Sequence, residues 1–580
     1  MCVCIHSHHN HGWRQNRRLA TDWIDRGVGA HHGMEPAFDS APQLRLRHFR
    51  DRAMDDRATS DRAACYMDSA VDVGDAFPSA GRVVVVSNRV AFPGSTQTGG
   101  LAQAMRSLLA ERGGLWVGWS GRNSDACACH EYSEGNVRLL TMDLPAVEFQ
   151  AYYGSFSNSA LWPLLHGRAD LVQFDDRAME AYLAVNRRFA DLLASVLRGN
   201  DTVWVHDYHL IPLASLLRAR GIRCRTGFFL HTPVPNAREI ALLPRHRELI
   251  GALASYDVVG VQTAPDASAL AGYLCTELGA ANAGPDGALV LEDGRRTRVA
   301  AFPIGIDVEA IARSAAQGGN GPARALRDSM AGRALLVGVD RLDYSKGLPQ
   351  RIRAFGEMLE RQPHLRGTAT LLQITPESRV ELTDYQQLGH EVQRLVGEVN
   401  GHYGDASWTP VRYVNRPYPH CDLTAFYRLA RVGVVTPLRD GMNLVAKEFI
   451  AAQDPEDPGV LVLSQFAGAA RELDSALLVN PLDTVRCADA MQRALAMPLA
   501  ERQLRWGAAM DSLHANRLSH WRDSFLGALA AARSTQTTAA ATISAAAAAP
   551  AGATLRRSER VIRQPASAAP SREVRSGINA

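Results

Sequence analysis

At 580 residues, the chain is too long for one ordinary hydrophobic core, so we expect two or more domains. Its 63 basic and 60 acidic residues leave a net charge of +3, which excludes the strongly basic balance of a nucleic-acid-binding protein. No apolar run approaches the ~20 residues that a membrane-spanning helix needs, and nine cysteines, most of them single within apolar segments, predict reduced thiols and a cytoplasmic location.

The two ends of the chain differ from the rest in composition. Residues 1–80 carry a crowded group of Cys and His without the paired Cys-x-x-Cys spacing of a metal site, and then Arg and Asp without apolar periodicity. Residues 534–580 are rich in Ala, Ser, Thr and Pro and cannot bury a core. We therefore expect a disordered extension at 1–80 and a disordered tail at 534–580.

Between these ends, short β-rich apolar runs alternate with segments of helical periodicity. The runs lie at 83–86, 202–205, 227–230, 258–261, 335–339, 370–374, 432–435 and 460–463, and the clearest helical segments at 179–197, 349–359, 382–399 and 444–452. Such alternation is typical of an α/β fold, with parallel sheets covered by helices on both faces. With a hinge near 303–306, it predicts two doubly wound, Rossmann-like domains at 81–310 and 311–533. The last helix of the second domain can pack back on the first.

Unusual polar residues follow the predicted strands. They are Arg89, Asp207 and His231 in the first series, and Arg341, Lys346, Arg379 and Asp440 in the second. Ligands of open α/β sheets bind beyond the carboxyl ends of the strands. These residues therefore predict one cleft between the two domains.

Ten motifs lie in order between about residue 82 and about residue 530. They are VVVVSNRV, TGGLA, GLWVGWSG, FSNSALWP, VWVHDYHL, GFFLHTPVP, FPIGID, DRLDYSKGLP, TPLRDGMNLVAKEF and GVLVLSQFAGAA. Together they closely resemble the trehalose-6-phosphate synthase family, and the block at 434–449 is the most specific of them. The resemblance implies the GT-B architecture, in which two Rossmann-like domains hold the active site in the cleft between them.

The second domain is expected to bind the nucleotide sugar. Arg341 and Lys346 can neutralise a diphosphate leaving group, although Arg341 could instead form only a surface ion pair with Asp340 or Asp343. The resemblance further assigns donor contacts to Gly99, Gly100, Tyr418, Asp440, Leu444, Val445, Ala446, Lys447 and Glu448. Free amides at the start of a helix suit a phosphate, and Glu448 suits the ribose hydroxyls. Without the resemblance, Lys447 and Glu448 would be the polar face of an amphipathic helix.

The first domain is expected to bind the phosphorylated acceptor. Arg89 and Arg379 can fix a phosphate through paired donors, Tyr153 adds a hydroxyl, and Trp162 offers an apolar face to a sugar ring. Asp207 is assigned to orient the attacking hydroxyl, and His231 to contact the donor sugar. Since two histidines flank Asp207, a structural or metal network is the alternative, but no third ligand is evident nearby.

The resemblance implies a retaining transfer of glucose from UDP-glucose to glucose 6-phosphate, giving α,α-trehalose 6-phosphate and UDP in trehalose biosynthesis. It implies front-side attack without a metal or other cofactor, in which the departing phosphate takes the acceptor proton. Asp207 and Asp440 could imitate the carboxylate pair of a glycosidase, but a basic diphosphate clamp would then have no purpose.

The sequence leaves alternatives open for the nucleotide sugar that is the donor, for the acceptor and for catalytic activity itself. ADP- and GDP-glucose are alternative donors, a same-fold enzyme with another acceptor is a rival, and so is an inactive sugar-phosphate-binding regulator. The expected partners are the small-molecule substrates. No nucleic-acid or membrane partner is expected. The family also implies a homo-oligomer, a dimer or a tetramer, and a separate trehalose-6-phosphate phosphatase.

Overall fold

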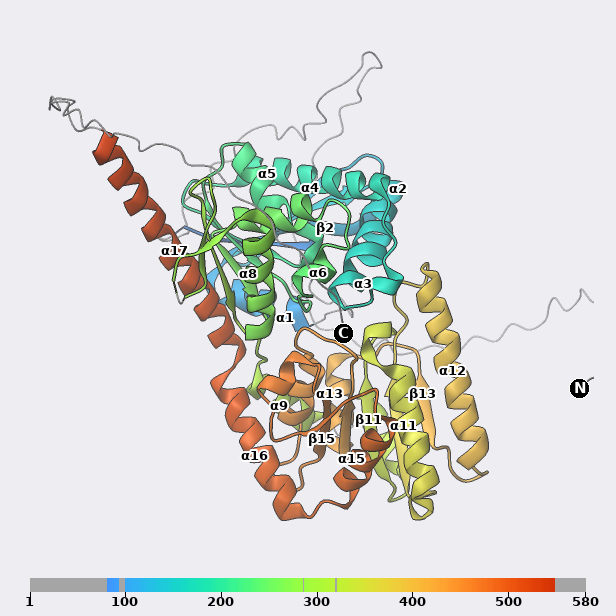
Figure 1. The fold of residues 1–580 in the computed structure, drawn as a ribbon. Helices are drawn as coiled ribbons and strands as arrows, with labels where there is room; N and C mark the ends of the chain where they lie inside the picture. Colours follow the sequence, from blue (N-terminus) through green and yellow to red (C-terminus); the bar gives the residue numbers. More distant parts are fainter. Residues whose placement is uncertain (1–80, 93–99, 285, 319–320, 548–580) are drawn as a thin grey trace, which may run out of the picture. The chain divides into compact units, whose positions relative to one another are not determined.

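The computed structural model describes residues 81–92, 100–284, 286–318 and 321–547. Two sheets organise this part of the chain, and each has helices against it (Figure 1). The predicted extension at 1–80 and the candidate donor residue Gly99 lie outside the described residues.

The first sheet has ten strands in the order β3-β4-β2-β1-β5-β6-β7-β10-β9-β8. The strands from β4 to β10 in that order are parallel, and antiparallel strands extend the sheet at both edges. Its strands are β1 (Val83–Arg89), β2 (Gly114–Asn123), β3 (Cys129–Glu134), β4 (Val137–Leu144), β5 (Thr202–His206), β6 (Arg225–Phe229), β7 (Val258–Val261), β8 (Ala281–Asn282), β9 (Ala288–Val290) and β10 (Arg296–Ala301).

The second sheet has six strands, all parallel, in the order β13-β12-β11-β14-β15-β16. Its strands are β11 (Ala334–Val339), β12 (Ala369–Ile374), β13 (Val411–Val414), β14 (Val432–Val435), β15 (Val460–Ser464) and β16 (Leu477–Val479). Strands β12, β14 and β15 are buried along their whole length, as expected for a sheet covered on both faces. The predicted α/β fold with parallel sheets is confirmed.

Helices connect the parallel strands. In the first half they are α1 (Gly100–Arg112), α2 (Ala146–Phe149), the π-helix η1 (Gln150–Leu161), α3 (Trp162–Leu165), η2 (Ala169–Leu171), α4 (Asp176–Val196), η3 (Tyr208–Leu210), α5 (Leu213–Ala219), α6 (Ala237–Ile240), α7 (His246–Leu249), η4 (Ile250–Ser255) and α8 (Ala264–Leu278). In the second half they are α9 (Val308–Gln317), α10 (Pro322–Met330), η5 (Tyr344–Lys346), α11 (Leu348–Arg361), η6 (Pro363–Leu365), α12 (Thr383–Tyr403), α13 (His420–Leu429), α14 (Leu444–Ala451), η7 (Gly468–Arg471), α15 (Thr484–Ala496), α16 (Leu499–Ala515) and α17 (Leu518–Ala547).

Two connections cross between the sheets. Residues 302–307 lead from β10 to α9, and Asn516 and Arg517 join α16 to α17. A Cβ on Gly305 would lie 2.1 Å from the Asn516 carbonyl oxygen, so only glycine allows this approach. The predicted hinge at 303–306 therefore lies where the chain passes between the two sheets and later returns.

The last helix, α17, contacts β6 and β7 of the first sheet, whereas α16 contacts β15 of the second (Figure 1). Phe525 stacks on Trp204 of β5 with ring centres 4.6 Å apart, and Trp521 meets Phe229 of β6 edge-on at 5.1 Å. The helix continues to Ala547, so residues 534–547, which were expected in a disordered tail, are helical instead. Alanine has the highest helix propensity, and the Ala-rich composition that argues against a core favours this extension of the helix.

Candidate active site

Several of the predicted site residues lie at the carboxyl ends of parallel strands. Asp207 directly follows β5, and His231 lies two residues after β6. In the second half, Arg341 lies two residues after β11, and Arg379 follows β12. Contacts between the two halves, described below, bring several of these side chains into one cluster.

An ion pair joins two predicted donor residues from different loops. Lys346, at the end of η5, places its Nζ 2.6 Å from Oδ2 of Asp440, and both side chains are 13% exposed. Asn443 Nδ2 donates to the same oxygen at 3.0 Å. Burial raises the pKa of Asp440, but the charge of Lys346 more than offsets it, so the pKa lies below its usual value. The pair is therefore charged and held in one geometry.

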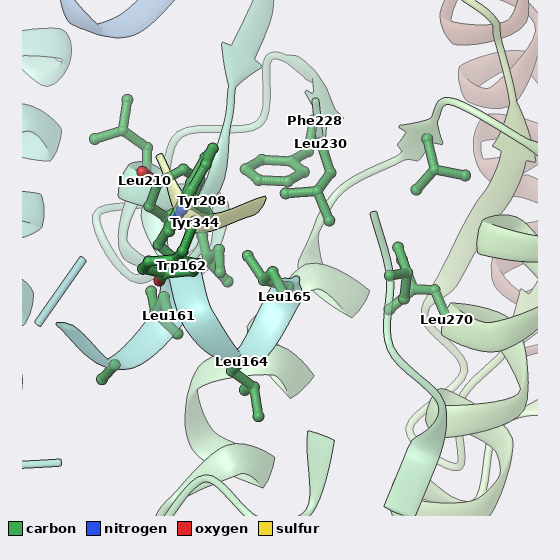
Figure 2. Packing of buried hydrophobic residues seen from close by; sticks show 14 of the residues in the cluster. Leu161, Trp162, Leu164, Leu165, Tyr208, Leu210, Phe228, Leu230, Leu270 and Tyr344 are labelled. Atoms are coloured by element: carbon green, nitrogen blue, oxygen red, sulfur yellow. The ribbon is translucent and has the colours of Figure 1, made fainter. Parts of the chain in front are cut away.

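Trp162 of α3 contacts two arginines of the second half. The guanidinium carbon of Arg379 lies 4.2 Å from the ring centre and that of Arg341 lies 4.7 Å from it, both at cation–π distance. Figure 2 shows Trp162 next to Tyr208, and their ring centres are 5.6 Å apart. Because Trp162 is only 6% exposed, its ring forms a buried apolar surface on which the two guanidinium groups lie.

The nearby carboxylate Asp343 was named from sequence only as a surface partner of Arg341. Arg341 Nε donates to Asp343 Oδ2 at 3.4 Å, as that alternative expected. The Asp343 side chain is 0% exposed, however, so the ion pair is not a surface pair. Arg379 Nη1 donates to the same oxygen at 3.2 Å. The other carboxylate considered, Asp340, pairs with Arg351 instead. The burial of Asp343 is not readable from the sequence, because its partners Trp162, Arg379 and Tyr385 are distant from it along the chain.

Asp207 has a strained backbone. Its φ of 75° and ψ of 165° fall in a region that is essentially restricted to glycine. Its Oδ1 accepts from the His231 amide at 3.3 Å, and burial raises the pKa of Asp207 to about 6. Such strain costs ~1–3 kcal/mol and is typical of functional sites. We interpret it as the means by which the carboxylate is aimed beyond the strand.

Three histidines near Asp207 are neutral. His206 Nδ1 lies 3.2 Å from His231 Nε2, and burial lowers the pKa of His231 to about 3. Burial likewise lowers the pKa of His209 to about 3, and its ring stacks on Tyr153 with centres 5.6 Å apart. The His206–His231 contact supports a structural role for His206, whereas neither ring nitrogen of the buried His209 has a hydrogen-bond partner among the described residues. Within the described ranges, no group of three His, Cys, Asp or Glu could hold a metal ion.

Two predicted acceptor residues lie farther along the first sheet. Tyr153, in the π-helix η1, is sandwiched between His209 and Phe149, whose ring centre is 5.0 Å away. Arg89, at the end of β1, is exposed, and its guanidinium carbon lies 5.5 Å from the ring centre of Trp119. Trp119 stacks on Phe149 at 4.2 Å, so a continuous row of aromatic rings links Arg89 to Tyr153.

Helix α14 presents its start to the Asp440 loop. Asn443, with a φ of 76°, caps it by accepting from the Ala446 amide at 3.3 Å. Lys447 is 0% exposed, pairs with Glu472 at 2.9 Å and donates to the Ile304 carbonyl at 2.7 Å. Its side chain is therefore engaged elsewhere, and only its backbone is left for a donor contact.

The remaining predicted donor residues take no part in the Lys447–Glu472 ion pair. Glu448 is 9% exposed and lies 3.6 Å from His420 Nε2, whose pKa it raises. Because Glu448 and Lys447 are both buried, the alternative of a solvated polar helix face is wrong. Tyr418 is partly buried and meets Phe426 edge-on at 5.1 Å. Gly100 begins α1, and the Leu444 and Val445 side chains are partly buried.

No helix in the described part of the chain is long and apolar enough to cross a bilayer. The model of glycosyltransferase family 20 matches residues 79–531. The trehalose-6-phosphate synthase of Sinorhizobium fredii (strain NBRC 101917 / NGR234) is 46% identical over 458 residues, which is 78% of this chain and 98% of the relative.

Two solved structures are also similar. A UDP-forming α,α-trehalose-phosphate synthase from Burkholderia xenovorans in complex with glucose-6-phosphate has a TM-score of 0.75 and 46% identity, covering 77% of this chain and 100% of that one. An E. coli structure bound with UDP-2-fluoro glucose has a TM-score of 0.74 and 42% identity, covering 77% of this chain and 99% of that one. The chain belongs to glycosyltransferase family 20.

Proposed function

We propose that this chain transfers glucose from UDP-glucose to glucose 6-phosphate, with retention at the anomeric carbon, giving α,α-trehalose 6-phosphate and UDP. The observation that carries the proposal is one cluster in which the cationic loop of Arg341 and Lys346 meets Trp162 and Arg379. A reaction between a nucleotide sugar and a sugar phosphate needs two anion-binding groups beside one sugar-sized apolar surface. The molecules bound in the B. xenovorans and E. coli structures, glucose-6-phosphate and UDP-2-fluoro glucose, support UDP-glucose and glucose 6-phosphate as the substrates here.

On the donor side, Lys346 and Arg341 face the diphosphate. Arg341 uses only its Nε for Asp343 at 3.4 Å, so the outer nitrogens of its guanidinium remain for phosphate oxygens. The Ala446 amide is taken by Asn443, so the Leu444 and Val445 amides are the donors at the start of α14. Glu448 accepts from the ribose hydroxyls, and Asp440 from hydroxyls of the transferred glucose. Gly99, Gly100 and Tyr418 complete the donor contacts through their backbone.

On the acceptor side, Arg89 and Arg379 bind the 6-phosphate with Tyr153, and the sugar ring lies against Trp162. Asp207 orients the attacking hydroxyl by accepting its hydrogen bond in the bound state, before the proton moves to the departing phosphate, and the ionised form of Asp207 is the better acceptor. His231 contacts the donor sugar, and its neutral ring avoids repulsion from positive charge developing at the anomeric carbon. The domain at 81–310 then binds the acceptor, and the domain at 311–533 binds the nucleotide sugar.

The attack takes place on the face from which UDP departs. The bond from the anomeric carbon to the diphosphate oxygen breaks, the acceptor oxygen bonds to that carbon, and its proton passes to the departing phosphate. Lys346 and Arg341 stabilise the charge on that phosphate. The clamp supplies this stabilisation from side chains, so we propose that the reaction needs no metal ion or other cofactor. We further propose that the enzyme acts in the cytoplasm as a dimer or tetramer, and that a separate phosphatase uses its product.

The proposal is tested by following UDP release in EDTA-treated buffer with glucose 6-phosphate and each of UDP-, ADP- and GDP-glucose. We expect the highest kcat/KM with UDP-glucose and full activity in EDTA. Turnover restored only by added Mg²⁺ would contradict the metal-independent clamp. Tight binding of both substrates without turnover would favour a regulator.

A further inference from the structure

Arg89, at the end of β1, has an exposed side chain that is held by stacking. Its guanidinium carbon lies 5.5 Å from the ring centre of Trp119. Within the described part of the chain, its guanidinium forms no hydrogen bond and no ion pair. A guanidinium carries all its N–H donors on its edge, so the contact with the Trp119 face leaves these donors for a ligand.

Gly121 lies close against the same guanidinium. A Cβ at this position would lie 2.8 Å from Nη2, 3.0 Å from Nε and 3.1 Å from Cζ of Arg89. Because ordinary contact begins at 3.4 Å, a side chain here would move Nη2 by ~0.6 Å or more. The position that the Arg89 guanidinium takes therefore depends on the missing Cβ of Gly121.

The turn at 119–122, which contains Gly121, is tied to β1 beside Arg89. The Val90 amide donates to the Trp119 carbonyl at 3.1 Å, and Arg89 pairs with Trp119 in the register of β1 and β2. The Trp119 indole Nε1 donates to the Arg122 carbonyl at 2.8 Å, which closes the turn. The aromatic ring and the glycine that contact the guanidinium are thus parts of one closed turn.

A buried carboxylate, Asp143 of β4, anchors this turn. Ser120 Oγ donates to Asp143 Oδ1 at 2.5 Å and accepts from the Arg122 amide at 3.0 Å. His130 Nε2 lies 3.1 Å from the other carboxylate oxygen, and Arg122 Nε lies 3.5 Å from Oδ1. Burial raises the pKa of Asp143, but these contacts outweigh it and hold the pKa below its usual value. The anchor is therefore a charged group with several partners.

We propose that the turn at 119–122 positions Arg89 for the acceptor phosphate, and that glycine is needed at 121 so that Arg89 can bind that phosphate through paired donors. This inference rests on the proposed function, which assigns Arg89 to the 6-phosphate. Gly121 is a positioning residue, because it acts on the ligand through the guanidinium. Paired N–H groups meet two phosphate oxygens only in one orientation, and a side chain at 121 would shift the guanidinium out of it.

The test compares Gly121→Ala with Gly221→Ala in the full chain. Gly221 precedes the start of β6 and has a φ of 79°, close to the 87° of Gly121, but a Cβ there would meet nothing within 4 Å. Both variants place an L-residue in the left-handed region, and only Gly121→Ala also displaces Arg89. Because the displaced atoms end a flexible side chain, we expect similar losses in the urea midpoint for the two variants.

Calorimetric titration gives the Kd of glucose 6-phosphate alone and of UDP alone. In Gly121→Ala we expect the Kd of glucose 6-phosphate to rise ~10-fold or more, since a misplacement of ~1 Å can cost on the order of 10²-fold. The Kd of UDP should not change, because Arg89 is assigned to the acceptor. A Kd for glucose 6-phosphate equal to that of Gly221→Ala, or an equal rise for both ligands, would overturn the inference.

A double variant tests whether Gly121 acts through Arg89. In an Arg89→Ala background, Gly121→Ala should change kcat/KM for glucose 6-phosphate by less than ~2-fold, because the group that it displaces is gone. If the two changes instead lower kcat/KM independently, so that their factors multiply, Gly121 has no positioning role.

If Gly121→Ala does not fold, Ser120→Ala replaces it. This change removes the hydroxyl that links the Arg122 amide to Asp143. We expect a smaller rise in the Kd of glucose 6-phosphate with the Kd of UDP unchanged, and an unchanged Kd for glucose 6-phosphate would refute the role of the turn. Failure of the proposed function is distinct, since it would appear as binding without turnover in the unaltered protein, where the Kd comparison still holds.

Discussion

Replacing Lys346 with Ala should affect catalysis more than stability. The Lys346–Asp440 pair has an N–O distance of 2.6 Å, but both side chains keep 13% exposure and Asp440 retains Asn443 as a partner. We therefore expect the free energy of unfolding to fall by ~1.5–3 kcal/mol, the range for a charged hydrogen bond, rather than the larger loss of a fully buried pair. Loss of one preorganised donor to the leaving group should lower kcat ~10²- to 10³-fold.

The assay is UDP release at saturating substrates, with urea unfolding measured on the same preparations. Arg361→Ala is the control, because its pair with Asp489 is 39% and 38% exposed and should contribute at most ~1 kcal/mol. A kcat within ~10-fold of the unaltered enzyme, or about 1.4 kcal/mol, would refute the role of Lys346 in the clamp. A loss of kcat that is fully explained by a larger unfolded fraction of the variant would refute this role as well.

Three further predictions concern Asp207 and Lys447. Since Asp207 has a φ of 75°, Asp207→Gly should be at least ~1 kcal/mol more stable to urea than Asp207→Ala, and equal stability would refute the strain. Burial raises the pKa of Asp207 to about 6, so kcat/KM for glucose 6-phosphate should fall as pH drops through about 6. The substrate phosphate also titrates near ~6, so Asp207→Asn, which retains only that limb, is the control, and an identical profile would contradict the assignment. The free energy of unfolding should change with pH in the opposite direction. Because the pKa of Asp207 is about 6 in the folded chain and ~3.9 in the unfolded chain, the stability linked to Asp207 is lost as the pH rises from ~3.9 through about 6. Lys447→Ala should lower the free energy of unfolding by ~3–5 kcal/mol, because it leaves Glu472 buried without its cation. A loss as small as that of Arg361→Ala would show that the Lys447 pair is not a buried one.

The strands that sequence predicted are those whose apolar runs are continuous and β-branched. All eight predicted runs fall within strands, apart from Leu230, one residue past the end of β6. The strand β2, by contrast, contains Gly114, Gly118 and Gly121, which weaken any strand pattern. Its order depends on pairing with β1 and β4 on either side, which only the folded sheet reveals.

Within the site, spacing along the chain located the loops but not the partners of their side chains. The position of Asp440 after β14 was readable, whereas its pairing with Lys346 spans 94 residues. The same holds for Lys447, whose place at the start of a predicted helix was readable although its partners Glu472 and Ile304 were not. Such long-range pairs depend on which loops the folded second half brings together, and local pattern carries no information about that.

Product analysis by NMR is the most direct measurement of a retaining transfer onto glucose 6-phosphate. The enzyme would be given UDP-glucose labelled with ¹³C at the anomeric carbon, together with glucose 6-phosphate, in EDTA-treated buffer. We expect one disaccharide phosphate with an α,α-1,1 linkage, the label in the α configuration and one UDP released per product. A β-configured label, or labelled free glucose without disaccharide, would contradict it.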